Sequence, residues 1–222
     1  MLNTQHNLKG MSLIEIMVAV AIVAILFAAA APDFSSWIQN TKIRNAAEAM
    51  QNGLTLAKTE AVHRNTISQF VSCGGSSWQV IAASSVSASA VVCGTNAATT
   101  GWEIVQARSI SEGSNNAVVD ATQPATGAAQ STIGFNGLGR QASTTDIPNG
   151  TITANPPVAV DFNINNSTAN ATCFCSAGTC GYPATVNYSS TGTLRCLRVT
   201  VTAGGQIRMC DPALAAGSPQ GC

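Results

Sequence analysis

Charged side chains are scarce in this sequence. Only 9% of the 222 residues are Asp, Glu, Lys or Arg, and ten basic residues balance ten acidic ones. Proteins that coat nucleic acid through bulk positive charge need many cations to neutralise phosphates. The zero net charge therefore excludes that class, although it leaves room for a small basic patch.

Aromatic residues and histidine are also rare. Phe, Trp and Tyr together make up 5% of the chain, which predicts a thin core, and there are two histidines. His63 has no neighbouring ligand residues in the sequence, so we interpret it as a surface or boundary residue. No Ser/His/Asp or Cys/His set is present in a credible arrangement. We therefore expect no catalytic residues, no cofactor and no enzyme activity.

Hydrophobic residues are concentrated in one run over residues 11–31. A helix of that length is about 31 Å long, which matches the hydrocarbon core of a bilayer. Lys9 precedes the run, so the N-terminus is predicted to stay in the cytoplasm while the rest of the chain is exported.

Glu15 interrupts this apolar run. A carboxylate in a membrane-spanning helix costs about 2.5–3.5 kcal/mol at the centre, so a functional partner is expected. The amine released by cleavage after Gly10 is the nearest available cation. Two alternatives are a secretory signal peptide cut within residues 28–31 and a simple signal anchor. Neither alternative explains Glu15.

Residues 9–15, KGMSLIE, resemble the signal sequence of type IV prepilins and of type II secretion pseudopilins. The resemblance implies that a membrane-embedded prepilin peptidase cleaves after Gly10 and methylates Met11, where the family usually has Phe. It also makes Glu15 the family's invariant acid. Pro32 falls where pilins often carry a helix-kinking proline. The implied partners are this peptidase/methyltransferase, other pilins or pseudopilins in a filament, and the inner membrane.

This processing is also reasonable chemically. After cleavage each subunit carries a cationic amine near an unpaired carboxylate, and each charge is unfavourable alone in a medium of low dielectric. A neighbouring subunit can pair them, and the pairing would set the axial register between helices. Methylation leaves the amine charged.

An amphipathic helix is predicted to continue over residues 32–65. Its apolar positions follow at spacings of three and four, which places them on one face. We expect this face to dock on the protein's own sheet, and Gly53 to mark a bend or a close contact. Glu60 and Arg64 form a favourable i,i+4 pair. The apolar stripe consists of Ile43, Ala47, Met50, Leu54, Ala57 and Ala61.

Strands and turns are predicted from residue 66 onward. Alternating residues in 195–202 and the turn at 203–205 indicate a C-terminal hairpin with 206–210. Asn136-Gly137 indicates another turn. The glycine pattern Gly134-x-x-Gly137-x-Gly139-Arg140 could suggest a phosphate-binding loop, but such a loop is followed by Lys-Ser/Thr and a helix, and both are missing here. We therefore interpret this pattern as a turn. Segments 111–131 and 165–192 are predicted loops. The remaining expected strands are 66–72, 78–83, 102–110 and 158–164.

Residues 43–47, 56–61 with 64–65, 135–140 and 205–212 resemble the FimT/GspH group of minor pilins and pseudopilins. The implied fold class is α+β, with a long N-terminal helix packed on antiparallel β-sheet and stapled by disulfides. The expected organisation is a leader at 1–10, a transmembrane and filament-core helix at 11–31, its amphipathic half at 32–65, and a β-rich domain at 66–222.

All eight cysteines follow the apolar run, which indicates disulfides in an oxidising compartment. Cys73 and Cys93 flank a predicted hairpin and are expected to pair, and Cys210 and Cys222 are expected to close a terminal loop. Four others allow three pairings. They could also form a zinc site, but their spacing lacks the usual pair of Cys-x2–4-Cys motifs. These four are Cys173, Cys175, Cys180 and Cys196.

The function predicted on this resemblance is that of a minor pilin in a type IV pilus. The alternative is a GspH-type pseudopilin of a type II secretion system. Either protein would sit in the bacterial inner membrane with one span and a periplasmic C-terminal domain before it enters the pilus or pseudopilus.

Weak, non-specific DNA binding for uptake is a further hypothesis. Some FimT-like minor pilins bind DNA through Gly-Arg-x-Arg in the C-terminal hairpin, and here residues 205–208 read GQIR. Arg208, Arg198 and Arg195 could form a small phosphate-binding patch. The alternative, which the missing arginine and the neutral charge favour, is that they are solvent-facing residues of the hairpin.

Overall fold

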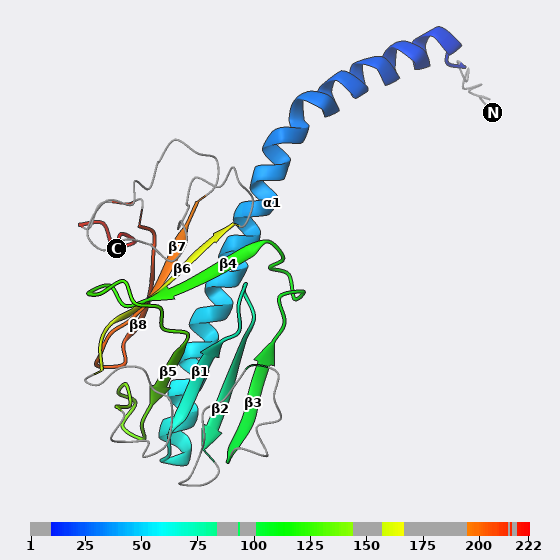
Figure 1. Ribbon diagram of the computed structural model, residues 1–222. Helices are drawn as coiled ribbons and strands as arrows, with labels where there is room; N and C mark the ends of the chain where they lie inside the picture. Colours follow the sequence, from blue (N-terminus) through cyan, green and yellow to red (C-terminus); the bar gives the residue numbers. More distant parts are fainter. Residues whose placement is uncertain are drawn as a thin grey trace, which may run out of the picture. The chain divides into compact units, whose positions relative to one another are not determined.

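The computed structural model describes residues 10–83, 93, 101–143, 157–166, 195–212, 214 and 217–222. The chain divides into two units, Met1–Ile38 and Gln39–Cys222. One helix, α1 (Leu13–Arg64), contributes to both units. The described strands all lie in the second unit, where the cyan half of α1 packs against them (Figure 1).

The N-terminal unit presents an apolar helix surface. The large apolar side chains from Met11 to Phe27 are 48–76% exposed. Over the described residues, no helix is both long enough and apolar enough to cross a membrane. Membrane insertion of residues 11–31 stays a prediction.

One face of the second half of α1 packs into the core of the globular unit. Every residue of the predicted apolar stripe is buried, with at most 1% of its surface exposed, so the predicted docking face is confirmed. The helix ends at Arg64 because Asn65 adopts a φ of 48° and Thr66 donates its N–H to the carbonyl of Ala61. This left-handed residue is a common way to stop a helix.

The predicted pair at the end of α1 is also present. Arg64 donates to Glu60 at 2.7 Å, and it makes a second bond of 2.6 Å to Glu103. Hydrogen bonds to Glu103 and Glu60 raise the pKa of the Arg64 guanidinium. The contact with Glu103 ties the helix end to a strand that lies far away in the sequence.

Two antiparallel four-stranded sheets pack on α1. The first has the order β3-β2-β1-β5, and the second has the order β4-β6-β7-β8. Phe70 of the first sheet meets Phe162 of the second edge-to-face, with ring centroids 5.6 Å apart, so one core joins both sheets. The strands are β1 (Ser68–Ser72), β2 (Trp78–Ala83), β3 (Trp102–Arg108), β4 (Ala117–Thr122), β5 (Thr132–Phe135), β6 (Val160–Asn166), β7 (Leu197–Val201) and β8 (Ile207–Cys210).

Six of these strands correspond to predicted ones, and the α+β class is confirmed. The loop predicted at 111–131 is wrong in part, because it contains β4. Strand β5 was not predicted. The sequence of β4, AVVDAT, has small and polar residues, and it becomes a strand by pairing with β6, for example Val119 with Ile164. Of the loop predicted at 165–192, β6 covers the first two residues, and 167–192 lie outside the described residues.

Two predicted disulfides are present, Cys73–Cys93 and Cys210–Cys222. Cys196 is also disulfide-bonded, so its sulfur is not a free thiolate for zinc. The predicted alternatives for the other three cysteines fall outside the described residues. These are Cys173, Cys175 and Cys180.

Candidate functional site

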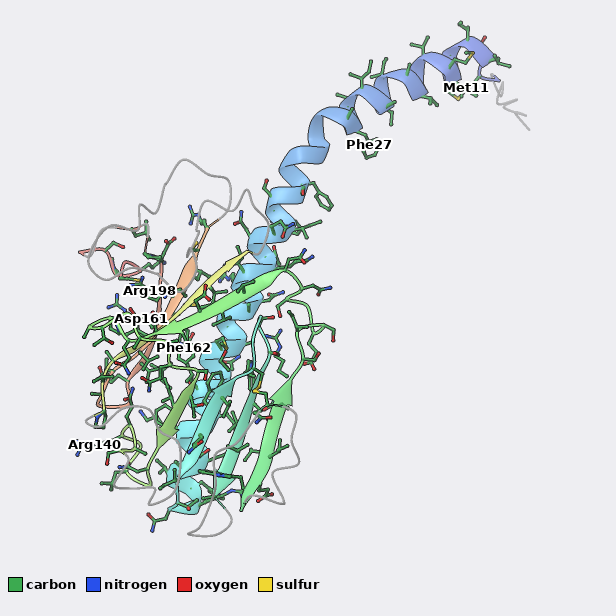
Figure 2. All side chains as sticks on the ribbon, viewed as in Figure 1. Met11, Phe27, Arg140, Asp161, Phe162 and Arg198 are labelled. Carbon is green, nitrogen blue, oxygen red and sulfur yellow. A yellow bond between two sulfur atoms is a disulfide. The ribbon has the colours of Figure 1, made fainter. Side chains whose placement is uncertain are left out.

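The start of α1 holds the residues predicted to direct processing. Gly10 has no side-chain or backbone neighbour within 4 Å of the position where a Cβ would be. Met11 is 67% exposed and projects from the helix end (Figure 2). Glu15 lies in the first turn, where the backbone N–H groups of the helix favour a carboxylate. Pro32 lies within α1.

The glycine-rich segment 134–140 forms a structural junction. Asn136 Oδ1 accepts the N–H groups of Leu138 (3.1 Å) and Arg140 (3.2 Å), and the carbonyl of Asn136 accepts the N–H of Gly139 (2.8 Å). These bonds close a tight turn after β5. The interpretation of this pattern as a turn is therefore confirmed.

This turn packs closely against α1 and the C-terminal hairpin because the glycines at the contact lack side chains. A Cβ on Gly137 would meet Asn65 Oδ1 at 2.5 Å, and one on Gly205 would overlap the carbonyl oxygen of Gly139. Lys58 Nζ donates to the carbonyl of Gly205 at 2.9 Å. We call Gly137, Gly139 and Gly205 the glycine junction. The glycine junction joins the end of α1, the turn after β5 and the C-terminal hairpin. Each of these segments contributed to the resemblance to the FimT/GspH group.

Two of the predicted DNA-binding arginines share one face of the second sheet. Thr200 pairs with Arg208 across β7 and β8, and Arg198 lies two residues before Thr200. Arg198 already has intramolecular partners. Its Nε donates to Asn163 Oδ1 at 2.7 Å, and its Nη1 lies 3.4 Å from Asp161 Oδ2. Both acceptors come from the neighbouring strand β6, so the positive charge of Arg198 is largely neutralised within the sheet.

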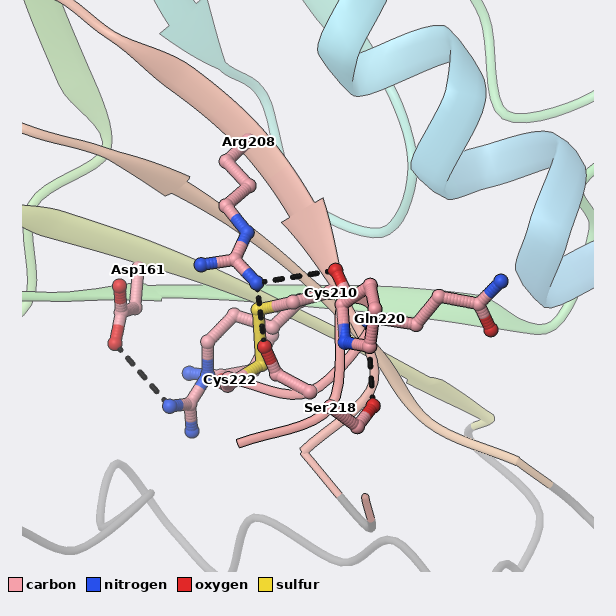
Figure 3. Close-up of a disulfide and its surroundings, with 10 residues drawn as sticks. Asp161, Arg208, Cys210, Ser218, Gln220 and Cys222 are labelled. Carbon is pink, nitrogen blue, oxygen red and sulfur yellow. Dashed lines mark hydrogen bonds and ion pairs between the residues drawn. A yellow bond between two sulfur atoms is a disulfide. The ribbon is translucent and has the colours of Figure 1, made fainter. Parts of the chain in front are cut away.

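Arg208 is held by the C-terminal loop. Its Nη2 donates to the carbonyl of Gly221 at 2.7 Å and to that of Pro219 at 3.3 Å, beside the Cys210–Cys222 disulfide (Figure 3). Arg195 precedes β7 and is exposed. Its backbone N–H donates to Asn40 Oδ1 of α1 at 2.8 Å. The structure thus brings Arg198 and Arg208 together but gives both of them internal bonds, which favours the solvent-facing interpretation.

A pocket beside α1 was missed by the sequence analysis. It has a volume of about 380 Å³ and lies between one flank of the helix and strands β2 and β3. Its residues come from three separate segments, so no motif or spacing in the sequence signals it. Its polar lining consists of Asn45, Glu48, Asn52, Trp78, Gln106, Arg108 and Glu112.

Comparison with known proteins gives two family matches. Residues 6–31 match the prokaryotic N-terminal methylation motif. Residues 46–157, half of the chain, match the family described as type II transport protein GspH. No curated protein matches significantly.

Solved structures of pilin-like proteins are similar at low identity. The type IV minor pilin FimU of Pseudomonas aeruginosa PAO1 is 13% identical with a TM-score of 0.45, and the match covers 79% of this chain and 93% of FimU. Escherichia coli GspH in solution is 11% identical with a TM-score of 0.40, covering 78% of this chain and 91% of that one. On the strength of the family matches, the chain belongs to the GspH family of pilin-like proteins and carries the N-terminal methylation motif.

Proposed function

We propose that this protein is a minor pilin of a type IV pilus. A prepilin peptidase would remove residues 1–10, methylate Met11 and leave the protein held in the inner membrane. The subunit would then enter or initiate the filament. The observation that carries the proposal is the exposed apolar surface from Met11 to Phe27, which contains Glu15 close to the cleavage point.

An apolar surface of this kind needs a cover. Its large side chains are 48–76% exposed in the single subunit, and contiguous apolar patches mark membrane or protein contacts. Lipid would cover the surface before assembly, and helices of neighbouring subunits would cover it in a filament.

Glu15 would set the axial register between the packed helices of neighbouring subunits. Once apolar helices surround it, its carboxylate needs a cation. The methylated amine of Met11 from a neighbouring subunit is a suitable partner because methylation keeps it charged. Pro32 is proposed to contribute to assembly through its position within α1, since proline removes one helix hydrogen bond.

The test is the mass and N-terminal sequence of the protein extracted from membranes. Cleavage after Gly10 predicts a chain that begins at Met11 and carries one additional methyl group. A mature N-terminus near Pro32 would identify a removed secretory signal and would overturn the proposal.

A GspH-type pseudopilin is the second candidate, because the matching family is described as a type II transport protein. The same N-terminal chemistry would serve it. The eight cysteines and the long polar segments lead us to prefer the pilus. Deleting the gene distinguishes the two: loss of surface pili with normal enzyme secretion supports the pilin, and the reverse supports the pseudopilin.

A further inference from the structure

The pocket beside α1 is built against an edge strand. In the order β3-β2-β1-β5, β3 lies at the edge of the first sheet, and the pocket occupies the space between it and the helix flank. Its volume of about 380 Å³ is within the range of small-ligand sites, and such sites carry a few convergent polar groups. No residue of this pocket is used in the proposed assembly chemistry.

Two unpaired donors lie in this pocket. Trp78 and Arg108 are direct partners across β2 and β3, so their side chains share one face of the sheet. Trp78 Nε1 and Arg108 Nη1 each expose less than 1 Å² and have no hydrogen-bond partner. Buried N–H groups are nearly always bonded in folded proteins, so two such donors side by side indicate a missing acceptor.

The positive charge of Arg108 also lacks a directly hydrogen-bonded carboxylate among the described residues. Its side chain is only 14% exposed, and its Nη2 donates to the backbone carbonyl of Glu112 at 2.6 Å. The nearest carboxylate oxygen, Glu112 Oε2, is 3.9 Å from Nε and belongs to a side chain that is 58% exposed. A mostly buried guanidinium is stabilised far better by a directly bonded anion than by this arrangement.

We propose that this pocket binds a ligand that presents a carboxylate. One carboxylate has two oxygens, which can accept from Trp78 Nε1 and Arg108 Nη1 together. Glu48 and Glu112 also line the pocket, so a phosphate dianion would be repelled more strongly than a carboxylate, which carries a single charge. Because Trp78 Nε1 and Arg108 Nη1 each expose less than 1 Å², neighbouring side chains must move for a ligand to reach them. The carboxylate belongs either to a free small molecule or to an acidic side chain of a polypeptide.

The direct test is a titration of the full chain in detergent micelles, followed by the indole N–H resonances of its tryptophans. N-acetylglutamate is expected to shift the Trp78 resonance in a saturable way. Acetyl-glutamine amide has nearly the same shape with both carboxylates replaced by uncharged amides, and it is expected to cause at most a small shift. Equal responses to the two probes, or no saturable shift with N-acetylglutamate, would overturn the proposal and leave water as the occupant.

Variants test which groups make the site. Arg108→Gln should weaken N-acetylglutamate binding on the order of tenfold or more, because a charge-assisted bond is lost. Glu112→Gln keeps the shape of the side chain but removes a competing anion, so it should bind more tightly. Trp102→Phe removes an indole from the separate cluster around Val71 and Ile81 and should leave binding unchanged. Unchanged affinity in both Arg108→Gln and Glu112→Gln would place the binding elsewhere.

The source of the carboxylate is distinguished by a blocked peptide, acetyl-Gly-Glu-Gly-amide. Tighter binding of the peptide than of N-acetylglutamate, by about tenfold, assigns the pocket to an acidic side chain of a polypeptide. Weaker binding of the peptide assigns it to free small carboxylates. These outcomes do not depend on whether the protein is a minor pilin.

Discussion

Gly205 is the residue at which the C-terminal hairpin comes closest to the turn after β5. Its φ is 78°, and a Cβ there would overlap the carbonyl oxygen of Gly139. We expect Gly205→Ala to destabilise the protein by about 2–4 kcal/mol, because backbone strain adds to a clash with backbone atoms that cannot rotate away. Urea unfolding of the full chain in detergent micelles measures this change.

Gly204→Ala is the matched control for this prediction. The nearest atom to a Cβ at Gly204 is Thr202 Oγ1 at 3.8 Å, an ordinary contact. Its effect should stay below about 1 kcal/mol. Equal stabilities for the two variants would show that the glycine junction does not require Gly205.

Any DNA binding by the arginines of the second sheet is expected to be weak and non-specific. Arg208 and Arg195 could contact phosphates, so the logarithm of affinity should fall with the logarithm of salt concentration with a slope of about −2 or shallower. Arg208→Gln should weaken binding. Asp161→Asn should strengthen it at low salt, because it removes the carboxylate 3.4 Å from Arg198. A gel shift measures all three proteins, and tight binding unaffected by Arg208→Gln would exclude the hairpin.

At the scale of elements, α1 contains Gly53, although glycine has a low helix propensity. Gly53→Ala should gain about 1 kcal/mol of helix propensity. A Cβ would lie 2.8 Å from Phe70 Cε2 and 3.1 Å from the Trp78 ring, and overpacking of this kind costs about 1–3 kcal/mol. We therefore expect a net loss of up to about 2 kcal/mol in the free energy of unfolding.

Thr55→Ala, at an exposed position of the same helix, provides the control for Gly53→Ala. It should be neutral or stabilising by a few tenths of a kcal/mol, because it improves propensity without adding atoms to the core. Denaturant midpoints compare the two variants. A stabilised Gly53→Ala would mean that β1 and β2 move away from the helix easily.

The C-terminal loop is expected to depend on its disulfide. Cys210 and Cys222 are 12 residues apart, and closing a loop of that length stabilises a fold by about 3 kcal/mol in the chain-entropy model. A Cys210→Ser/Cys222→Ser variant should lose a similar amount in thermal or urea unfolding. Ser218→Ala in the same loop should change stability by less than about 1 kcal/mol. An unchanged midpoint in the double variant would contradict the prediction.

At the scale of the whole molecule, Glu15 should govern assembly rather than folding. Glu15→Val removes an acid from an apolar surface, so the protein should still be inserted and folded. It should lose incorporation into the filament, because its carboxylate can no longer pair with a neighbouring N-terminus. Pull-down of sheared filaments measures incorporation. Glu60→Gln, on the globular half of α1, should assemble normally, and normal filaments with Glu15→Val would count against the proposed role.

Local patterns were sufficient for most of the fold. The stripe from Ile43 to Ala61 predicted both the helix and its buried face, because apolar residues spaced by three and four positions lie on one face of an α-helix. The alternation of Leu197, Val199 and Val201 similarly predicted β7. The strand β4 was missed because its small and polar residues become a strand only through their pairing with β6.

By itself, the sequence determined the processing motif, the apolar run with Glu15, the helix stripe and two disulfides, because each depends on residues close together in the chain. Only the tertiary structure decided what the distant residues do. It paired Arg198 with Asp161, bound Arg208 to the terminal loop, and set Trp78 beside Arg108 in a pocket with α1. The physical reason is that a contact between distant segments depends on sheet register and packing, which no local spacing records.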